Sequence, residues 1–166
     1  NTYADEAKNY IKTAESYIEK GELKAAIIQL KNAIQQQPSN PDARISLGKV
    51  YYLKGDGASA EKEIIRAKEL GVQRSTWIIP LAEVSLSLGR DSDLINTIDP
   101  KSEDSPNLKA KILGLQGKAH MHMNQFAFAM RRLESDSNVR QTDVRVLRGK
   151  AQNTLADKGG NTSSAH

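Results

Sequence analysis

The sequence contains no cysteine, few aromatic residues and no long apolar run, and each absence excludes a class of protein or site. Without cysteine, the chain forms no disulfide, holds no thiolate zinc site and has no cysteine nucleophile. Aromatic residues make up 5% of the 166 residues, so few side chains are available as stacking platforms. No apolar run approaches the roughly 20 residues that a membrane-spanning helix needs. The composition, 38% hydrophobic and 27% charged, instead suits a soluble helical chain.

The charged residues are numerous and mixed in sign. The chain has 24 Lys and Arg residues against 20 Asp and Glu residues, and its formal net charge of +4 corresponds to a pI near 9.2. Basic and acidic side chains are interspersed instead of clustered, so the excess charge favours solubility over attraction to nucleic acid. We therefore expect no nucleic-acid partner.

The residues that could carry catalysis are too scattered to form a site. His120 and His122 are two positions apart, so on one helix their side chains point about 200° apart and cannot share a metal ion. The glycines do not form a phosphate-binding loop, and no serine lies in a nucleophile elbow. We predict a protein with no catalytic residue, no metal site and no cofactor.

Small and apolar residues recur along the chain at one spacing. Gly21, Gly55 and Gly89 are each 34 residues apart, a period typical of tandem helix pairs. We call each set of residues that recurs at this spacing a column. Four further columns have the same spacing, with a shift of one residue in the last unit: Ala14, Gly48, Ala82 and Gly117; Tyr17, Tyr51, Ser85 and His120; Ala26, Ala60, Leu94 and Ala129; Leu30, Ile64, Ile98 and Leu133. The phase predicts pairs of helices that turn at the glycine and approach closely at the small residues. His120 is expected to pack in the core in place of a tyrosine.

The period divides the chain into helix pairs. We expect a repeat array over residues 1–157 and a disordered tail at 158–166, because the tail is rich in Gly, Ser and Asn. The predicted units of the array are residues 7–40, 41–74, 75–107 and 110–141, followed by a single helix at 142–156. Each unit would bury its apolar face only against its neighbours.

Capping residues indicate where several helices begin and end. Asn40-Pro41 and Ser105-Pro106 are typical of an N-cap followed by Pro at the first helical position. Asn124 stands where the earlier turns have Gly, and we expect it to adopt the same left-handed conformation. Asp99-Pro100 is expected to end the second helix of the third unit early.

The columns resemble those of the tetratricopeptide repeat (TPR), in which a small residue, an aromatic residue, Gly or Asn, Ala, a bulky apolar residue and a closing Pro follow one another. The match is best over residues 7–40 and 42–71 and covers about residues 7–156. This resemblance implies an all-α fold, a right-handed superhelical solenoid of tandem helix-turn-helix repeats. It also implies that the first helices line a concave groove that binds peptides.

Four shorter segments resemble a narrower group. The runs 25–33, 43–55, 60–63 and 80–90 are similar to the TPR lipoproteins of the PEP-CTERM/exosortase systems. That resemblance implies a bacterial cell-envelope protein facing the periplasm, with a lipid anchor upstream of Asn1 and a role in exopolysaccharide production or protein sorting. The chain has no lipobox cysteine of its own, and a cytoplasmic location is the alternative.

The repeat phase places three rows of side chains on the first helices. The two apolar rows are Ile11, Ile45, Ile79, Gly114 and Val146, and Ile18, Tyr52, Leu86, Met121 and Asn153; the charged row between them is Glu15, Lys49, Glu83, Lys118 and Lys150. Together they could bind a partner segment. Alternatively, the apolar residues pack against the next unit, above all Ile45 and Ile79, and neighbouring opposite charges pair with one another. The pairing of charges is the favoured interpretation of the charged row.

These observations predict a non-catalytic protein-protein interaction scaffold that binds a partner segment on its concave groove. The residues expected to contact the partner are Lys49, Tyr52, Glu83, Lys118, Met121 and His122. One alternative is a nucleic-acid-binding helical repeat protein, which the mixed charge disfavours. Another is an envelope glycan-binding protein, for which Tyr3, Tyr52 and Trp77 are the candidate aromatic platforms.

Overall fold

The computed structural model describes residues 2–134, 145–146, 148–153 and 156, and this part of the chain is helical without any β-strand. The chain divides into two compact units, Asn1–Leu88 and Gly89–His166. The boundary between the units falls between the two helices of the third predicted repeat. The all-α fold of tandem helix pairs is thus confirmed.

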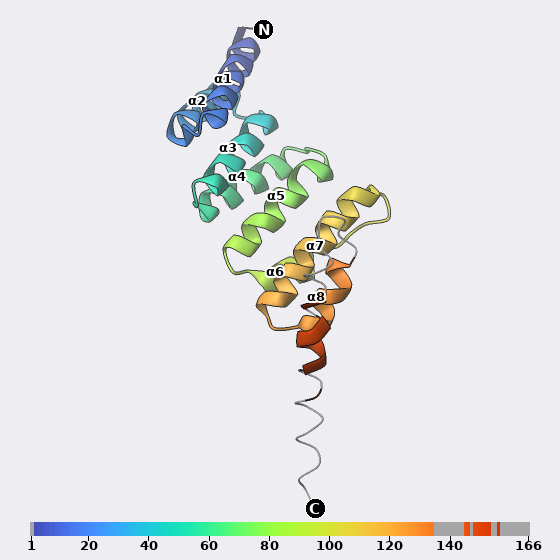
Figure 1. Cartoon of the computed structure of the whole chain (residues 1–166). Coiled ribbons are helices and arrows are strands. Elements are labelled where there is room, and N and C mark those ends of the chain that lie inside the picture. Colours follow the sequence, from blue (N-terminus) through green and yellow to red (C-terminus); the bar gives the residue numbers. More distant parts are fainter. Residues whose placement is uncertain (1, 135–144, 147, 154–155, 157–166) are drawn as a thin grey trace, which may run out of the picture. The chain divides into compact units, whose positions relative to one another are not determined.

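The first unit contains five helices that follow one another as antiparallel neighbours. They are α1 (Thr2–Glu19), α2 (Leu23–Gln36), α3 (Pro41–Leu53), α4 (Gly57–Glu69) and α5 (Arg74–Ser87). Each helix packs against the next, and α3 also contacts both α1 and α5 (Figure 1). The first helices of successive pairs therefore lie beside one another, as the repeat period predicts.

The second unit begins with a short helix. Its elements are α6 (Asp91–Thr97), α7 (Pro106–His122) and α8 (Phe126–Leu133), and α7 packs against both α6 and α8. Residues 145–146, 148–153 and 156 are also helical, within the predicted single helix at 142–156. The remaining residues of that helix and the predicted tail at 158–166 lie outside the described residues.

The turns between paired helices share one hydrogen-bond pattern. Gly21, Gly55 and Asn124 have φ values of 74°, 83° and 58°, the left-handed region that the sequence predicts for them. In the first turn the N–H of Gly21 donates to the carbonyl of Ile18 and the N–H of Glu22 donates to that of Tyr17. The same two bonds recur at Gly55 and Asn124 and satisfy carbonyls that the ends of the first helices would otherwise leave free.

The small residues mark the points at which paired helices touch. A Cβ atom added to Gly48 would lie 2.7 Å from Cγ1 of Ile64, and one added to Gly117 would lie 2.6 Å from Cγ of Leu133. Ala26 and Ala60 are fully buried at the corresponding positions of the second helices. A larger residue in these columns would force the helices apart.

Three predicted helix ends agree with the structure, and the start of the first helix does not. The side chains of Asn40 and Ser105 cap α3 and α7 by accepting hydrogen bonds from the N–H groups of Ala43 and Leu108. Helix α6 ends at Thr97, before Asp99-Pro100. Helix α1 begins at Thr2, five residues before the predicted start of the first unit, because residues 2–7 contain no Pro or Gly to interrupt it and Asp5 favours a helix N-terminus.

One proline lies within a helix. Pro80 is the seventh residue of α5, past the first turn of the helix. Its ring removes one backbone N–H from the helix ladder. The side chain of Ser85, nearby on the same helix, donates to the carbonyl of Leu81.

Candidate functional site

The predicted contact residues lie in both units. Lys49 and Tyr52 lie on α3 and Glu83 on α5 in the first unit, whereas Lys118, Met121 and His122 lie on α7 in the second. Lys49, Lys118 and His122 are exposed, as is Tyr52 with 36% of its surface, and Glu83 and Met121 are half-buried. We call the exposed side chains of α1, α3 and α5 the first-helix surface.

The charged row of the first-helix surface does not pair as the sequence analysis favoured. Within the described part of the chain, Glu15, Lys49 and Glu83 make no ion pair or side-chain hydrogen bond. The prediction of pairing between neighbouring charges is wrong for these three, because an exposed pair of long side chains gains only about 0–1 kcal/mol and loses conformational entropy. Alternating charges therefore remain available to a ligand.

The apolar rows are largely occupied by packing in the first unit. Ile45 is 4% exposed and belongs to the cluster between α3, α4 and α5, as the packing interpretation expects. Ile11 and Ile18 are half-buried against the cluster centred on Leu30. Tyr52 stays exposed, next to Leu53 with 60% of its surface exposed, so apolar contact surface remains at the C-terminal end of α3.

The candidate residues of the second unit have different surroundings. Nδ1 of His122 lies 2.9 Å from Oδ1 of Asp91, which links the end of α7 to the start of α6. His120 is buried, as predicted; its Nδ1 lies 2.7 Å from Oε1 of Gln125, and its ring stacks on Phe128 at 5.4 Å. Lys118 is exposed without an ion pair within the described residues.

Trp77, one of the aromatic platforms considered for a glycan site, is covered by cations. Nζ of Lys68 lies 4.5 Å from the ring centroid and the Arg74 guanidinium carbon 5.8 Å from it. Cations placed over an indole face are attracted by its quadrupole and take up the surface on which a sugar would stack. Trp77 therefore offers less open ring than a glycan platform needs.

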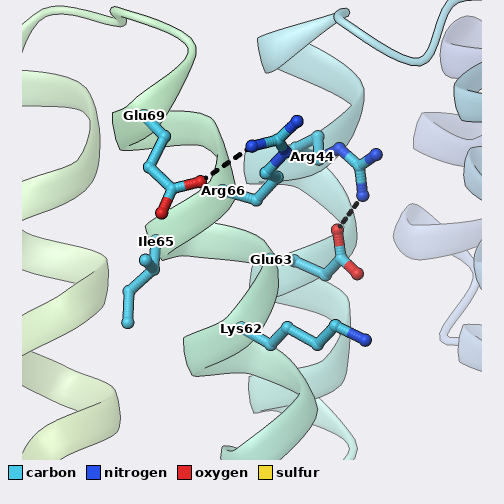
Figure 2. Close-up of a pocket in the computed structure, with 6 residues that line it drawn as sticks. All are labelled: Arg44, Lys62, Glu63, Ile65, Arg66 and Glu69. Carbon is cyan, nitrogen blue, oxygen red and sulfur yellow. Dashed lines mark hydrogen bonds and ion pairs between the residues drawn. The ribbon is translucent and has the colours of Figure 1, made fainter.

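A second surface, which the sequence analysis did not identify, is a hollow of about 500 Å³ over the outward face of α4 (Figure 2). We call it the α4 hollow, and it is lined by Arg44, Lys62, Glu63, Ile65, Arg66 and Glu69. Nη1 of Arg44 lies 2.8 Å from Oε2 of Glu63, and Nη1 of Arg66 lies 2.9 Å from Oε2 of Glu69. The signal in the sequence was the run of charges at helical spacing around Ile65.

Neither metal ligands nor a membrane span are found where the chain is described. No three or more His, Asp or Glu side chains gather there in a way that could hold a metal ion. None of the described helices combines the length and the apolar character needed to cross a bilayer.

The geometry of the chain is that of a helical repeat protein built from stacked helix-turn-helix pairs. A model of the TPR repeat matches residues 14–55, and the fold is that of solved TPR proteins. Residues 14–55 thus have the sequence of a TPR repeat, and the chain as a whole has the fold of TPR proteins. No curated protein matches the chain in sequence.

Three solved structures illustrate the likeness. The chain is 18% identical to YrrB, described as a TPR protein with an unusual peptide-binding site, with a TM-score of 0.60 over 76% of this chain and 64% of YrrB. It is 17% identical to Pseudomonas aeruginosa pilF, with a TM-score of 0.68 over 95% of this chain and 72% of pilF. A tetratricopeptide repeat protein from Parabacteroides merdae is 16% identical, with a TM-score of 0.71 over 92% and 61%. At these identities the likeness concerns the fold.

Proposed function

We propose that this chain is a non-catalytic scaffold whose first-helix surface binds a segment of another protein. The observation that carries the proposal is the set of unpaired charges around Lys49, together with the exposed ring of Tyr52 on the same helix. A fixed surface of this kind binds without first having to order itself, and its charges are already free of internal partners. YrrB, which shares the fold, is described as having a peptide-binding site, and this supports a peptide ligand.

The ligand that fits this surface is an extended or helical segment with both charged and apolar side chains. Lys49 would accept a carboxylate, Glu15 and Glu83 would accept basic groups, and Tyr52 would cover an apolar side chain. On the second unit, taken by itself, Lys118, Met121 and His122 would contact a segment of a partner protein. Alternating charges select the direction and register of the segment more than they add to its affinity.

A random peptide library displayed on phage, selected against the whole chain, tests the proposal. We expect the selected peptides to lose about tenfold or more in affinity for a Lys49→Glu/Tyr52→Ala variant. The matched control is Lys31→Glu/Ile28→Ala on α2, which makes the same charge reversal and truncates an exposed isoleucine in place of a tyrosine. Selected peptides that bind the Lys49→Glu/Tyr52→Ala variant as tightly as the original chain would show that the first-helix surface is not the binding site.

We also propose a location in the bacterial cell envelope, facing the periplasm and held by a lipid anchor upstream of Asn1, with a role in exopolysaccharide production or protein sorting. This proposal is supported by the resemblance of residues 25–33, 43–55, 60–63 and 80–90 to the TPR lipoproteins of the PEP-CTERM/exosortase systems. Fractionation of the source cells followed by immunoblotting tests it. Recovery of the protein in the cytoplasmic fraction would contradict it.

A further inference from the structure

The α4 hollow is lined mainly by the second helix of its pair, with Arg44 as its one residue from the first helix. The inner faces of α2 and α4 match: Leu30 and Ile64 are buried at equivalent positions. The outer faces do not match. The residues of α1 and α2 that lie 34 positions before those lining the hollow are Tyr10, Ile28, Gln29, Lys31, Asn32 and Gln35. The first pair forms the same fold with one charge at these positions, whereas the second pair has five.

The two ion pairs in the hollow differ in how firmly they are held. The side chains of Arg44 and Glu63 are only 18% and 13% exposed, and Arg44 also donates from Nη2 to the carbonyl of Pro38 at 3.2 Å. This pair is a fixed part of the wall. The side chains of Arg66 and Glu69 are 53% and 55% exposed, so their bond contributes little and opens readily.

The hollow also contains a cation without a partner. Among the described residues, Lys62 makes no ion pair or side-chain hydrogen bond. It lies one helical turn before Arg66, and Figure 2 shows both side chains extending from the same side of α4. Residues four apart on a helix are neighbours, so one carboxylate or two adjacent ones can contact both cations.

An apolar contact lies beside these cations. Ile65 is 39% exposed and lines the same hollow three residues after Lys62, and Figure 2 shows the two side chains extending in different directions from α4. A ligand that crosses α4 would meet the cations first and the isoleucine next. Burial of an apolar side chain on Ile65 would remove both groups from water.

We propose that the α4 hollow is a second binding surface, one that receives an acidic segment of a partner protein. A carboxylate of the segment binds Lys62 and Arg66, and an apolar side chain next to it packs on Ile65. The positive charges that attract the acidic segment are those of Lys62, which has no partner among the described residues, and of Arg66. Arg66 exchanges its exposed bond to Glu69 for a stronger bond to the carboxylate of the segment. This goes beyond the function proposed above, because the ligand lies on a second helix and not on the first-helix surface.

Fluorescence anisotropy with two labelled ten-residue peptides tests the proposal. One peptide alternates pairs of Glu with Leu or Phe, and the other has Gln in place of every Glu. We expect the acidic peptide to bind the whole chain, to bind less tightly as NaCl is raised, and to bind about tenfold or more tighter than the Gln peptide. Equal affinity for both peptides, or no binding of the acidic peptide at millimolar concentration, would overturn the proposal.

Charge-reversal variants locate the site. Lys62→Glu/Arg66→Glu is expected to weaken binding of the acidic peptide by about tenfold or more. Lys24→Glu/Lys31→Glu on α2 makes the same change in net charge at two exposed positions and is expected to change the affinity less than about threefold. Equal losses in the two double variants would mean that only the net charge of the chain attracts the peptide, and the α4 hollow would be excluded.

Two further measurements distinguish binding in the hollow from binding elsewhere on the chain. Ile65→Ala should weaken binding by about threefold, while Ile28→Ala, at an exposed isoleucine of α2, should not. Amide NMR shifts on addition of the acidic peptide should fall on α4; shifts confined to α1, α3 and α5 would assign the peptide to the first-helix surface and refute the proposal. If light scattering shows that the chain self-associates through the same residues, the occupant is a second copy and not an acidic segment.

Discussion

The two units bury different kinds of side chain, and the difference shows two ways to hold a helix pair together. In the first unit Ser85 is the one polar side chain buried among the described residues, and clusters of aliphatic residues fill the space between helices. In the second unit Asp104, Gln116 and His120 are buried. Long helices supply enough apolar surface to hold one another, whereas a short one needs specific hydrogen bonds.

The short helix is α6, which has seven residues and buries only Leu94. Gln116 on α7 donates from Nε2 to the carbonyl of Ile98 at 2.7 Å and to Oδ1 of Asp99 at 2.9 Å. His122 contacts Asp91 at the other end of α6. Two side chains of α7 therefore hold the two ends of a helix that is too short to be stable by packing alone.

The largest expected effect comes from placing a polar residue in the first unit. Leu47 occupies the position in α3 that Gln116 occupies in α7, and it is 2% exposed among Leu30, Val50 and Ala14. Leu47→Gln would lose an apolar contact and bury an amide without a partner, which should cost about 3–5 kcal/mol. Urea unfolding followed by the fluorescence of Trp77 measures this in the first unit. A cost below about 1 kcal/mol would show that this core tolerates polar groups as the second one does.

The reciprocal change in the second unit should cost less. Gln116→Leu removes both hydrogen bonds and leaves the carbonyl of Ile98 without its donor, but it also removes a buried Oε1 atom that has no partner. We expect a net loss of about 1–2 kcal/mol, with faster hydrogen exchange in α6. An unchanged or higher stability would mean that α6 is held by packing and that the contrast between the units is false.

Variants at the turns should change the stability of the two units by smaller amounts. Gly55 and Asn124 make the same two backbone hydrogen bonds at φ values of 83° and 58°. Gly55→Asn should therefore destabilise the first unit and Asn124→Gly stabilise the second, each by about 1 kcal/mol or less, because Gly enters this region without steric cost. Thermal unfolding of both variants measures the shifts. Shifts of the same sign in both variants would contradict the shared turn geometry.

The smallest effect concerns helix caps and depends on pH. Hydrogen bonds from the hydroxyl and the backbone N–H of Ser59 hold the pKa of Asp56 below its ordinary value of 3.8. A carboxyl with a lowered pKa in the folded state stabilises it above the unfolded pKa, and this stabilisation is lost as pH falls through the folded pKa. Asp56→Asn should lower the Tm at neutral pH, with the difference shrinking as the pH falls below 3.8 and through the lower pKa of the folded state. The cap of the second unit, Ser105, has no charge, and Ser105→Asn should show no such pH dependence.

The sequence predicted the features that depend on local geometry. Gly21 and Asn124 turn the chain, Asn40 and Ser105 cap helices, and Gly48 admits its partner helix, because each role follows from backbone conformation or side-chain size at one position. The repeat period then extends each role to the equivalent positions. This is why the fold could be predicted without any structure.

The sequence did not predict the side-chain contacts that decide the candidate sites. Whether Lys49 pairs with Glu83 depends on rotamers and on small energy differences, and the expectation of pairing was wrong. The α4 hollow needs Arg44 from one helix to meet Glu63 from another, which no periodicity reveals. Gln116 bonds to the end of α6 because the chain there leaves the carbonyl of Ile98 free to accept a hydrogen bond, and the sequence does not show the path of the chain after α6.

The close contacts at Gly48 and Gly117 limit the spacing between the helices of two pairs in the same way. In each pair the helices lie so close that there is room for the hydrogen atom of glycine but not for a Cβ atom. The glycine that permits this distance belongs to the pair itself. We expect that α3 and α4 could be exchanged for α7 and α8 in a chimaera without altering the distance between helix axes, provided that both glycines are kept. Gene duplication and recombination could therefore lengthen or shorten such an array at its connecting segments while every hairpin keeps its internal shape.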